Sequence, residues 1–394
     1  MSEKKTLILI DGHALAFRQF FALERSGMKN AENQPTWAVY GFFKAIFDLL
    51  SKIKPDFIAV AFDVGRQTFR VDKFEEYKAN RETMPDALRS QIGVICEGLN
   101  AFDIPIYTKE GYEADDVIGT ISAIASKNGH NTLILTGDQD SFQLIDKEGT
   151  VKVLIPSKGD LIEYNWDKVY EKLGVYPSQI TDYKGLRGDT SDNIPGVRGI
   201  GEKTAQKLLN RYTNLEEVLA DCENIPEKSV REKLCEGKEI AILSKDLATI
   251  IRDVDVQFDI NTAKVTLPDM EKVSSFLRKM QFYTFVKNID KILSSFNKNS
   301  QNDDNNLNLF KNDTDFSPVQ CGFFTQAIKE TVEDTSVEYE LVTKDNLQDK
   351  ILEIKASEKV GFRLRFEDEK IYSAAFSNGK NYYFDNEFIN PFSK

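Results

Sequence analysis

Aspartates follow three apolar segments in the first part of the chain. Asp11 follows LILI, Asp63 follows FIAVAF, and Asp138 follows LILTG, with Asp140 two residues later. Continuous rather than alternating hydrophobicity is typical of strands that are buried on both faces of a parallel sheet. The carboxyl ends of parallel strands lie along one edge, where ligands bind, so we expect these four carboxylates to lie close together. A single aspartate after a strand is common in turns, but three in succession favour a site.

Two further acidic groups have the spacing to join them. GYEADDVIG places Glu113, Asp115 and Asp116 in the first turn of a predicted helix, where the helix dipole favours acids. In GDTSDN, Asp189 and Asp192 are three residues apart and are therefore predicted to share one helical face. If all nine carboxylates converge, their mutual repulsion must be offset.

Oxygen ligands, in a chain with two histidines, select hard cations such as Mg²⁺ or Mn²⁺ rather than Zn²⁺. Two such ions about 3.5–4 Å apart hydrolyse phosphodiesters, one activating the attacking water and the other stabilising the leaving 3′ oxygen. A calcium-type structural site is the simpler alternative, but its D-x-[DN]-x-[DN]-G loop is absent.

A glycine-rich turn follows these acids, in NIPGVRGIGEKTAQKLL. Gly196 and Gly201 have P-loop spacing, but Glu202 intervenes before the lysine and no strand is predicted to precede them. A helix–hairpin–helix turn is the better interpretation, because glycines let backbone N–H groups approach a nucleic-acid phosphate. A glycine-rich helical corner without a ligand is the alternative. The candidate DNA-binding residues here are Gly196, Gly199, Gly201, Lys203 and Thr204.

A basic segment lies between Asp63 and a helix predicted over residues 84–100. Cations alternate there with Phe69, Phe74 and Tyr77, a pattern that suits single-stranded nucleic acid, in which phosphates are paired and bases stacked. A solvated charged face is the alternative. The cations are Arg66, Arg70, Lys73, Lys78 and Arg81, and Arg18 is a further one after Asp11.

Strand and helix patterns alternate over residues 1–175, which predicts a doubly wound, mostly parallel α/β domain. The predicted strands are 7–10, 57–62, 132–136 and 151–155, and the predicted helices are 84–100 and 113–127. Residues 176–292 are predicted to be a helical subdomain with helices at 178–187, 203–211, 215–221 and 227–250. Residues 293–318, rich in Asn, Asp and Ser, are typical of a flexible linker. Residues 319–394 contain the strand-like segments EYELV, GFRLRF, KIYSAAF and NYYF.

The net charge of −12 argues at first against a nucleic-acid partner. However, residues 301–394 hold 11 basic and 18 acidic side chains, which is more than half of the excess. The four cysteines are far apart in sequence and form no C-x-x-C, which excludes a thiolate zinc site and suits a reducing cytosol. The chain lacks a signal-peptide pattern and an apolar run of the ~20 residues that span a bilayer. We therefore expect a cytoplasmic, nucleoid-associated protein and no membrane partner.

Residues 1 to about 292 closely resemble the 5′ nuclease domains of bacterial DNA polymerases I, in the flap endonuclease and phage 5′ exonuclease family. The stretches that carry the resemblance are LILIDGHALAFR, AVYGF, VAFDVGRQTFR, YKANR, GYEADDVIG, LTGDQDSFQLI and GDTSDNIPGVRGIGEKTA. The resemblance implies a PIN-like α/β core and a two-metal, Mg²⁺-dependent 5′→3′ exonuclease and 5′-flap endonuclease. It also implies action on 5′ flaps, nicks and RNA–DNA primers in Okazaki primer removal and DNA repair. We expect the chain to be a monomer.

The resemblance also assigns roles to residues. Asp11, Asp63, Glu113 and Asp115 would hold one metal, and Asp138, Asp140, Asp189 and Asp192 the second, supported by Asp116. Lys78 and Arg81 match family residues that contact the scissile phosphate, with Arg70 nearby. The basic and aromatic pattern described above makes Arg18, Arg66 and Tyr77 further candidate DNA contacts. Residues 65–90 would form a helical arch, and the hairpin at 196–204 would grip duplex DNA and hold K⁺.

The segment after residue 318 resembles the start of a 3′→5′ exonuclease-like domain. Its GFRLRFED segment lacks the D-x-E of active proofreading enzymes, so we expect an incomplete, inactive α+β domain, with no polymerase region present. Two alternatives to the nuclease interpretation stay open. One is a DNA-binding scaffold whose acids merely cap strands and helices, and the other is a PIN-type ribonuclease.

Overall fold

The computed structural model describes residues 4–65, 67–81, 83–157 and 160–296, together with four strand segments between residues 340 and 385. The chain divides into two compact units, Met1–Pro318 and Val319–Lys394. Each unit is considered by itself.

The first unit is built around a six-stranded sheet with the strand order β3-β2-β1-β4-β5-β6. All pairs are parallel except β5 with β6, and β1 is central, with Leu7 paired to both Phe57 of β2 and Thr132 of β4. The predicted strands are confirmed, whereas β3, which has two residues, and the partly exposed edge strand β6 gave no clear apolar run. The strands are β1 Thr6–Asp11, β2 Phe57–Ala61, β3 Ile106–Tyr107, β4 Asn131–Leu135, β5 Val151–Ser157 and β6 Asp160–Tyr164.

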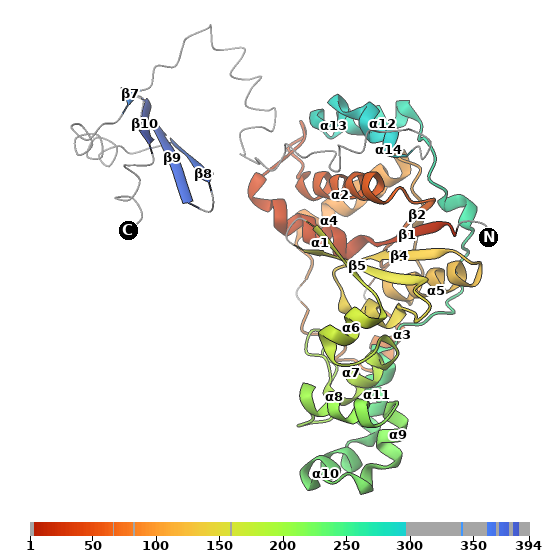
Figure 1. Ribbon diagram of the computed structural model, residues 1–394. Helices are drawn as coiled ribbons and strands as arrows, with labels where there is room; N and C mark the ends of the chain where they lie inside the picture. Colours follow the sequence, from red (N-terminus) through yellow and green to blue (C-terminus); the bar gives the residue numbers. More distant parts are fainter. Residues whose placement is uncertain are drawn as a thin grey trace. The chain divides into compact units, whose positions relative to one another are not determined.

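Helices cover both faces of this sheet, as the doubly wound prediction requires (Figure 1). Ile8 and Ile10 of β1 pack into one core with α1, α2 and α4, and the alternate residues Leu7 and Leu9 pack into a second core with α5. Successive strand side chains point to opposite faces, so β1 is buried on both. The bounds are α1 Gly12–Leu23, α2 Trp37–Ile53, α4 Asp86–Ala101 and α5 Ala114–Lys127.

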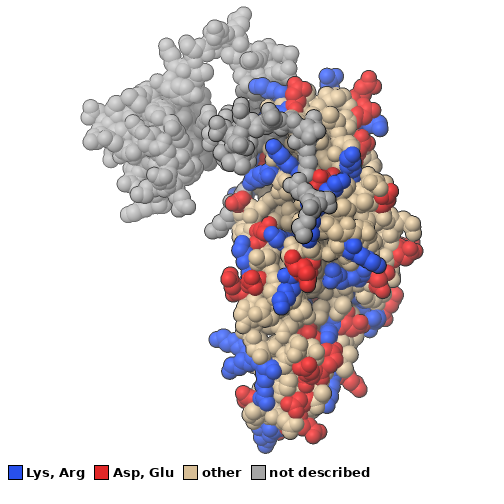
Figure 2. Space-filling view, turned by 45° about the vertical axis from the view of Figure 1, so that its right-hand side comes forward, with Lys and Arg blue, Asp and Glu red and all other residues tan. Residues whose placement is uncertain are grey.

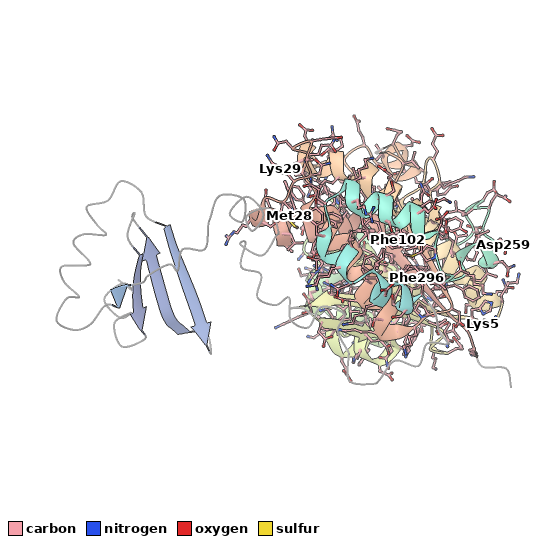
Figure 3. All side chains as sticks on the ribbon, turned by 90° about the horizontal axis from the view of Figure 1, so that it is seen from above. Lys5, Met28, Lys29, Phe102, Asp259 and Phe296 are labelled. Atoms are coloured by element: carbon pink, nitrogen blue, oxygen red, sulfur yellow. A yellow bond between two sulfur atoms is a disulfide. The ribbon has the colours of Figure 1, made fainter. Side chains whose placement is uncertain are left out.

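The helices α12 Met270–Lys279, α13 Tyr283–Lys287 and α14 Ile289–Ser295 return to the first of these cores. Phe276 contacts Phe43 of α2, and Phe296 stacks on Phe102 at 5.9 Å between ring centroids (Figure 3). We expected residues 176–292 to form one helical subdomain. That boundary is wrong for α12–α14, because their aromatic side chains complete the α/β core.

The helices of residues 180–248 have a core of their own, which includes Leu186, Leu208, Leu215 and Leu234. One helix was expected over 227–250, but two are found, separated at Gly237. A Cβ at this glycine would lie 2.8 Å from Val197 Cγ1, so the close approach to the hairpin requires glycine there. The helices are α7 Ile180–Arg187, α8 Glu202–Arg211, α9 Leu215–Ala220, α10 Lys228–Glu236 and α11 Lys238–Ala248, and α6 Trp166–Leu173 precedes them.

The segment over the sheet edge, residues 65–90, contains less helix than the arch that was predicted. A short helix, α3 Phe69–Lys73, is followed by turns, and α4 begins at Asp86. Lys78 has a φ of 55°, a left-handed conformation that ends any helix through this stretch. The turn carries Lys78 to the acidic edge of the sheet, as described below.

The second unit contains a four-stranded sheet in the order β7-β10-β9-β8. β7 pairs with β10 in parallel and the other pairs are antiparallel. The four predicted strand segments are confirmed, with the bounds β7 Glu340–Leu341, β8 Gly361–Glu367, β9 Lys370–Ser377 and β10 Asn381–Asp385.

Charged side chains are distributed over the surface of the first unit. Basic and acidic side chains are interspersed over the face in Figure 2. In the described part of the chain, no helix combines the length and hydrophobicity that crossing a bilayer requires.

Cys222, in the short 3₁₀ helix Cys222–Asn224, and Cys235 of α10 form a disulfide. The sequence interpretation did not expect this pairing, because the two cysteines are 13 residues apart in a segment with no disulfide motif. Packing of α10 against the 3₁₀ helix brings them together.

We predict that protease mapping without reductant recovers the peptides of Cys222 and Cys235 joined. Reduction should lower the free energy of unfolding by about 3 kcal/mol, because the closed loop restricts the unfolded chain. Cys96→Ser, at a free cysteine, is the control and should change neither result. Separate peptides from unreduced protein would contradict the pairing.

Candidate active site

The predicted strand-end aspartates lie at one edge of the sheet. Asp11 is the last residue of β1, where its Oδ1 accepts a hydrogen bond from Ala14 N at 2.9 Å and caps α1. Asp63 follows β2 and accepts from Ala114 N, the first residue of α5, at 2.7 Å. Asp138 follows β4 and accepts from Asp140 N at 2.9 Å. The carboxylates therefore cap the elements that follow the strands and face the same edge.

The start of α5 supplies the next three acids, as predicted. Glu113 is its N-cap residue and Asp115 and Asp116 are in its first turn. Asp115 lies half-buried beside Asp11, Asp138 and Glu113, whose charges act on it. Parallel β–α connections deliver this helix start to the strand ends.

Asp189 and Asp192 join the same cluster from a turn rather than from a helix. Asp189 and Ile194 exchange two backbone hydrogen bonds of 2.8 Å, which close the turn after α7. The prediction that the two acids share a helical face is therefore wrong. Gly188, with a φ of 73°, ends α7 before them and leaves room for Pro195, whose carbonyl a Cβ would meet at 2.7 Å.

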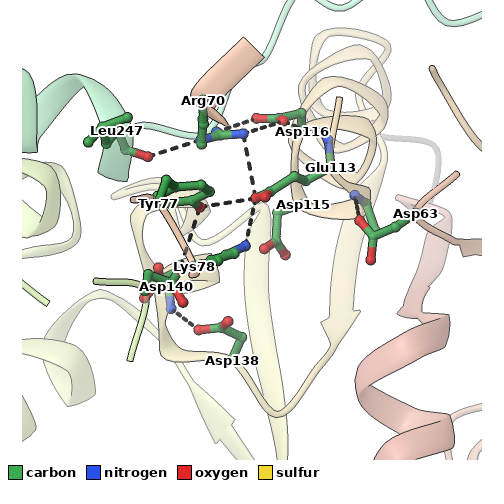
Figure 4. Close-up of polar contacts among 12 residues, drawn as sticks. Asp63, Arg70, Tyr77, Lys78, Glu113, Asp115, Asp116, Asp138, Asp140 and Leu247 are labelled. Atoms are coloured by element: carbon green, nitrogen blue, oxygen red, sulfur yellow. Dashed lines mark hydrogen bonds and ion pairs between the residues drawn. The ribbon is translucent and has the colours of Figure 1, made fainter. Parts of the chain in front are cut away.

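Basic side chains lie between the carboxylates and link these segments. Lys78 Nζ lies 2.8 Å from Glu113 Oε2 and 3.7 Å from Asp192 Oδ2. Arg81 also pairs with Asp192. Lys184 of α7 pairs with Asp140 and, at 2.5 Å, with Asp189. Figure 4 shows six of the predicted acids together, namely Asp63, Glu113, Asp115, Asp116, Asp138 and Asp140. Asp11, Asp189 and Asp192 are linked to them through the charges of Asp63 and Asp138 and through Lys184 and Lys78.

Crowding shifts the ionisation of several of these acids. Burial and the neighbouring charges of Asp63 and Asp138 raise the pKa of Asp11 to about 6. Burial and the charge of Asp138 raise the pKa of Asp140 to about 7, and the pKa of Asp115 is also raised by burial and by Asp138 and Asp11. Burial would raise the pKa of Asp189 too, but the ammonium of Lys184 outweighs it and holds the pKa at about 2. The cluster therefore favours added positive charge.

The donor set fits a hard divalent cation, because the clustered ligand atoms are carboxylate oxygens. Among the residues that the structure describes, no three acidic, histidine or cysteine side chains converge closely enough to hold a metal. Instead, lysine and arginine side chains form ion pairs with these carboxylates. The ligand atoms of the site therefore suit a metal, while their arrangement in this structure is that of ion pairs.

Arg70 and Asp116 have a different role from the one predicted. The guanidinium donates two hydrogen bonds of 2.7 Å to Asp116, one of 2.9 Å to Leu247 O and one of 2.7 Å to Thr249 O. Arg70 is 2% exposed and Asp116 0%. Asp116 also accepts from Glu113 N at 3.0 Å. Both side chains are buried and engaged with each other and with the backbone, and through these contacts they position Glu113.

Tyr77 is buried as well, which corrects its prediction as a DNA contact. It is 5% exposed, and its hydroxyl donates to Glu113 Oε2 at 3.3 Å. Burial and the charges of Glu113 and Asp192 raise its pKa, so the hydroxyl stays protonated and supports the cluster.

The predicted hairpin lies between α7 and α8. Gly196 has a φ of 61°, and a Cβ there would meet Gly188 N at 2.1 Å, so these two glycines pack backbone to backbone. Gly199 and Gly201 are exposed, and Gly201 precedes α8, whose first turn holds Lys203 and Thr204. Arg18 is exposed on α1, and Arg66 lies outside the described residues.

Three side chains in the site were not predicted. Lys184 is 9% exposed between two acids, His13 Nδ1 lies 3.1 Å from Asp63 Oδ2, and Thr136 donates to Asp11 Oδ2 at 3.0 Å. Burial would raise the pKa of Asp63, but the hydrogen bonds from His13 and Ala114 lower it. His13 and Thr136 lie inside motifs already singled out. No sequence signal indicates that Lys184, on α7, is buried rather than exposed to solvent.

Comparison with known proteins adds a family to this geometry. Residues 6–174 match the family model "5'-3' exonuclease, N-terminal resolvase-like domain", and residues 175–271 match "5'-3' exonuclease, C-terminal SAM fold". DNA polymerase I of Caldicellulosiruptor bescii is 44% identical over 285 residues, which are 72% of this chain and 33% of that protein. The chain spans about a third of the length of the curated relatives it matches.

Two solved structures show the same fold. One is bacteriophage T5 5′-exonuclease with bound divalent metal ions (zinc), with a TM-score of 0.52 and 21% identity, covering 74% of this chain and 98% of that one. The other is T5 flap endonuclease in a pseudo-enzyme-product complex with DNA and metal ions, with a TM-score of 0.52 and 20% identity, covering 74% and 99%. Both likenesses agree with a mostly parallel, PIN-like sheet.

We predict that Arg70→Met lowers the free energy of unfolding by about 3–5 kcal/mol, because it leaves the buried Asp116 carboxylate without its partner. Urea unfolding at pH 7 measures the change. Arg18→Met, at an exposed arginine, is the matched control and should stay within about 0.5 kcal/mol. A decrease in the free energy of unfolding of less than about 1 kcal/mol for Arg70→Met would show that the Arg70–Asp116 ion pair does not stabilise the fold.

Proposed function

The chain belongs, through residues 6–271, to the 5′-3′ exonuclease family, and from this membership we propose that it is a Mg²⁺-dependent, structure-specific 5′ nuclease. The observation that carries the proposal is the cluster of carboxylates at the sheet edge, with Lys78 and Arg81 beside it and the hairpin of residues 196–204 following Asp189 and Asp192. The reaction is the hydrolysis of a phosphodiester near a 5′ end or at the base of a 5′ flap.

Two divalent cations, when bound, would supply activation of the attacking water and stabilisation of the leaving oxygen. Asp11, Asp63, Glu113 and Asp115 would hold one, and Asp138, Asp140, Asp189 and Asp192 the other. Mg²⁺ is the cation that oxygen ligands of this kind prefer, and Mn²⁺ would substitute. The pKa values of Asp11 and Asp140 are raised by burial and by neighbouring carboxylates, and they support this assignment because a bound cation would offset both effects.

Lys78 and Arg81 would place positive charge next to the scissile phosphate. Both lie on the turn that follows α3, and the Arg81 side chain is 48% exposed, within reach of a ligand at the edge. Glu113 and Asp192 orient them through ion pairs. Arg70 and Tyr77 hold Glu113 in place beneath them.

The hairpin would bind the duplex part of the substrate. Gly199 and Gly201 are exposed at the start of α8, and the N-terminus of that helix attracts phosphate through its free N–H groups. Lys203 adds a cation there. The family resemblance extends the proposal to a K⁺ ion at residues 196–204. The T5 flap endonuclease of the same fold has been solved with DNA, which supports a DNA partner.

The proposed biological role is supported by the names of the relatives, which are DNA polymerases I. We place the activity in Okazaki primer removal and DNA repair, on flaps, nicked duplexes and RNA–DNA primers at the nucleoid. A binding scaffold and a PIN-type ribonuclease are the competing functions, and the next two experiments separate them.

A 5′-flap DNA labelled at its 5′ end should be cut by the full chain with Mg²⁺ and stay intact with EDTA. The matched RNA-only hairpin should be a poor substrate. Cleavage of RNA alone would favour the ribonuclease, and no cleavage with Mg²⁺ or Mn²⁺ would leave only the scaffold.

Asp138→Asn and Asp189→Asn should each lower the cleavage rate by about 10²-fold or more, because each removes charge that holds a cation, and each 1.36 kcal/mol of lost stabilisation is tenfold in rate. Asp167→Asn, an exposed aspartate of α6, is the control and should cleave normally. Single-turnover rates at saturating enzyme, with circular dichroism to confirm folding, measure the effect. Full activity of both variants would mean that the acids only cap their elements.

A further inference from the structure

Lys184 places a buried positive charge between two carboxylates that come from different elements. Asp140 follows β4, and Asp189 opens the turn after α7. The Lys184 ammonium pairs with both and is 9% exposed. Both acids belong to the group that would hold one divalent cation in the proposed function, so the lysine lies where that cation would bring its charge.

An ammonium and a divalent cation compete for such a pair of acids. Both are attracted to the same carboxylate oxygens, and their like charges repel one another strongly at separations of a few Å inside a protein. A lysine side chain is a point charge on a flexible four-carbon stem, so it can leave its partners without movement of the backbone. An arginine fork held from several sides, such as Arg70, lacks this freedom.

We propose that Lys184 is a built-in counter-ion, a positioning residue that neutralises Asp140 and Asp189 in the cation-free protein and is displaced when the divalent cation binds. This inference rests on the proposed function, because it concerns the same site. It has two consequences: the cation-free cluster stays folded despite its repulsion, and the affinity for the cation is lower than the carboxylates alone would provide.

The chain contains a matched lysine outside the cluster. Lys245 of α11 bridges Asp182 of α7 at 2.6 Å and Glu216 of α9 at 2.7 Å. It therefore also joins two carboxylates from different elements, and its partners are not among the nine acids of the site. Lys245→Gln reports the structural cost of losing such a bridge without any effect on a cation.

The first experiment titrates the full chain with Mn²⁺ in the absence of DNA and follows free Mn²⁺ by electron paramagnetic resonance. Lys184→Gln should bind Mn²⁺ about tenfold more tightly than the unmodified chain, as expected when a competing charge is removed. Lys245→Gln should bind with unchanged affinity. Equal or weaker Mn²⁺ binding by Lys184→Gln would overturn the proposal and show that the lysine serves only to stabilise the fold.

Thermal unfolding of the same proteins provides a second readout. Lys184→Gln should lower Tm in EDTA and recover most of that loss with saturating Mn²⁺, because the bound cation replaces the missing charge and stabilises by mass action. Lys245→Gln should lower Tm equally in both conditions. A loss for Lys184→Gln that Mn²⁺ does not reduce would contradict displacement.

A third measurement uses the unmodified chain, so it does not depend on the folding of a variant. Brief acetylation with acetic anhydride, followed by mass spectrometry, reports how accessible each lysine amine is. Acetylation of Lys184 should rise several-fold when Mg²⁺ or Mn²⁺ is added, whereas that of Lys245 should not change. Equal acetylation of Lys184 with and without cation would overturn the proposal.

These outcomes are separate from those of the flap assay. If the chain binds Mn²⁺ and exposes Lys184 but cuts no flap, the proposed function is refuted and the counter-ion role of Lys184 is supported. If the chain cuts flaps with Mg²⁺ but Lys184→Gln binds Mn²⁺ with unchanged affinity, the proposed function is supported and the counter-ion role of Lys184 is refuted.

Discussion

Repulsion among carboxylates is the constraint on which the rest of this structure depends. At the sheet edge the charges of Asp11, Asp115 and Asp138 act on one another, Asp63 acts on Asp11, and Asp138 acts on Asp140. Asp11 is buried and the other four are half-buried, which limits the water that screens them. Without compensation the acids would take up protons or push the edge apart. Burial and the neighbouring carboxylates together raise the pKa values of Asp11, Asp115 and Asp140, so the edge favours added positive charge.

Basic side chains from segments that are distant in sequence offset this repulsion. Lys78 and Arg81 come from the turns before α4, and Lys184 comes from α7. Arg70 acts one layer below, where its guanidinium joins Asp116 to the backbone at Leu247 and Thr249. The acidic edge, the segment above it and the end of α11 are thereby held together, so the site and the helical subdomain share their stability.

Periodicity and composition were sufficient for the inner strands β1, β2, β4 and β5 and for the helices α4, α5, α7, α8 and α9. Apolar runs such as residues 57–62 mark strands because a strand buried on both faces has no polar side to conserve. Local patterns could not reveal contacts made across the fold. The return of α12–α14 to the α/β core, the break at Gly237 and the pairing of Cys222 with Cys235 all depend on partners that are close in space but separated in sequence, which local periodicity does not reveal.

For the site, the sequence by itself determined which acids lie at the edge, because a residue that ends a parallel strand or begins the next helix has its place set by topology. It did not determine what the basic residues do. In the sequence, nothing distinguishes Arg70, Tyr77 and Lys184 from exposed basic or aromatic residues on short helices and turns. Only the tertiary structure shows that they are buried. Burial depends on which distant surface packs over a side chain, and neither residue type nor spacing encodes that.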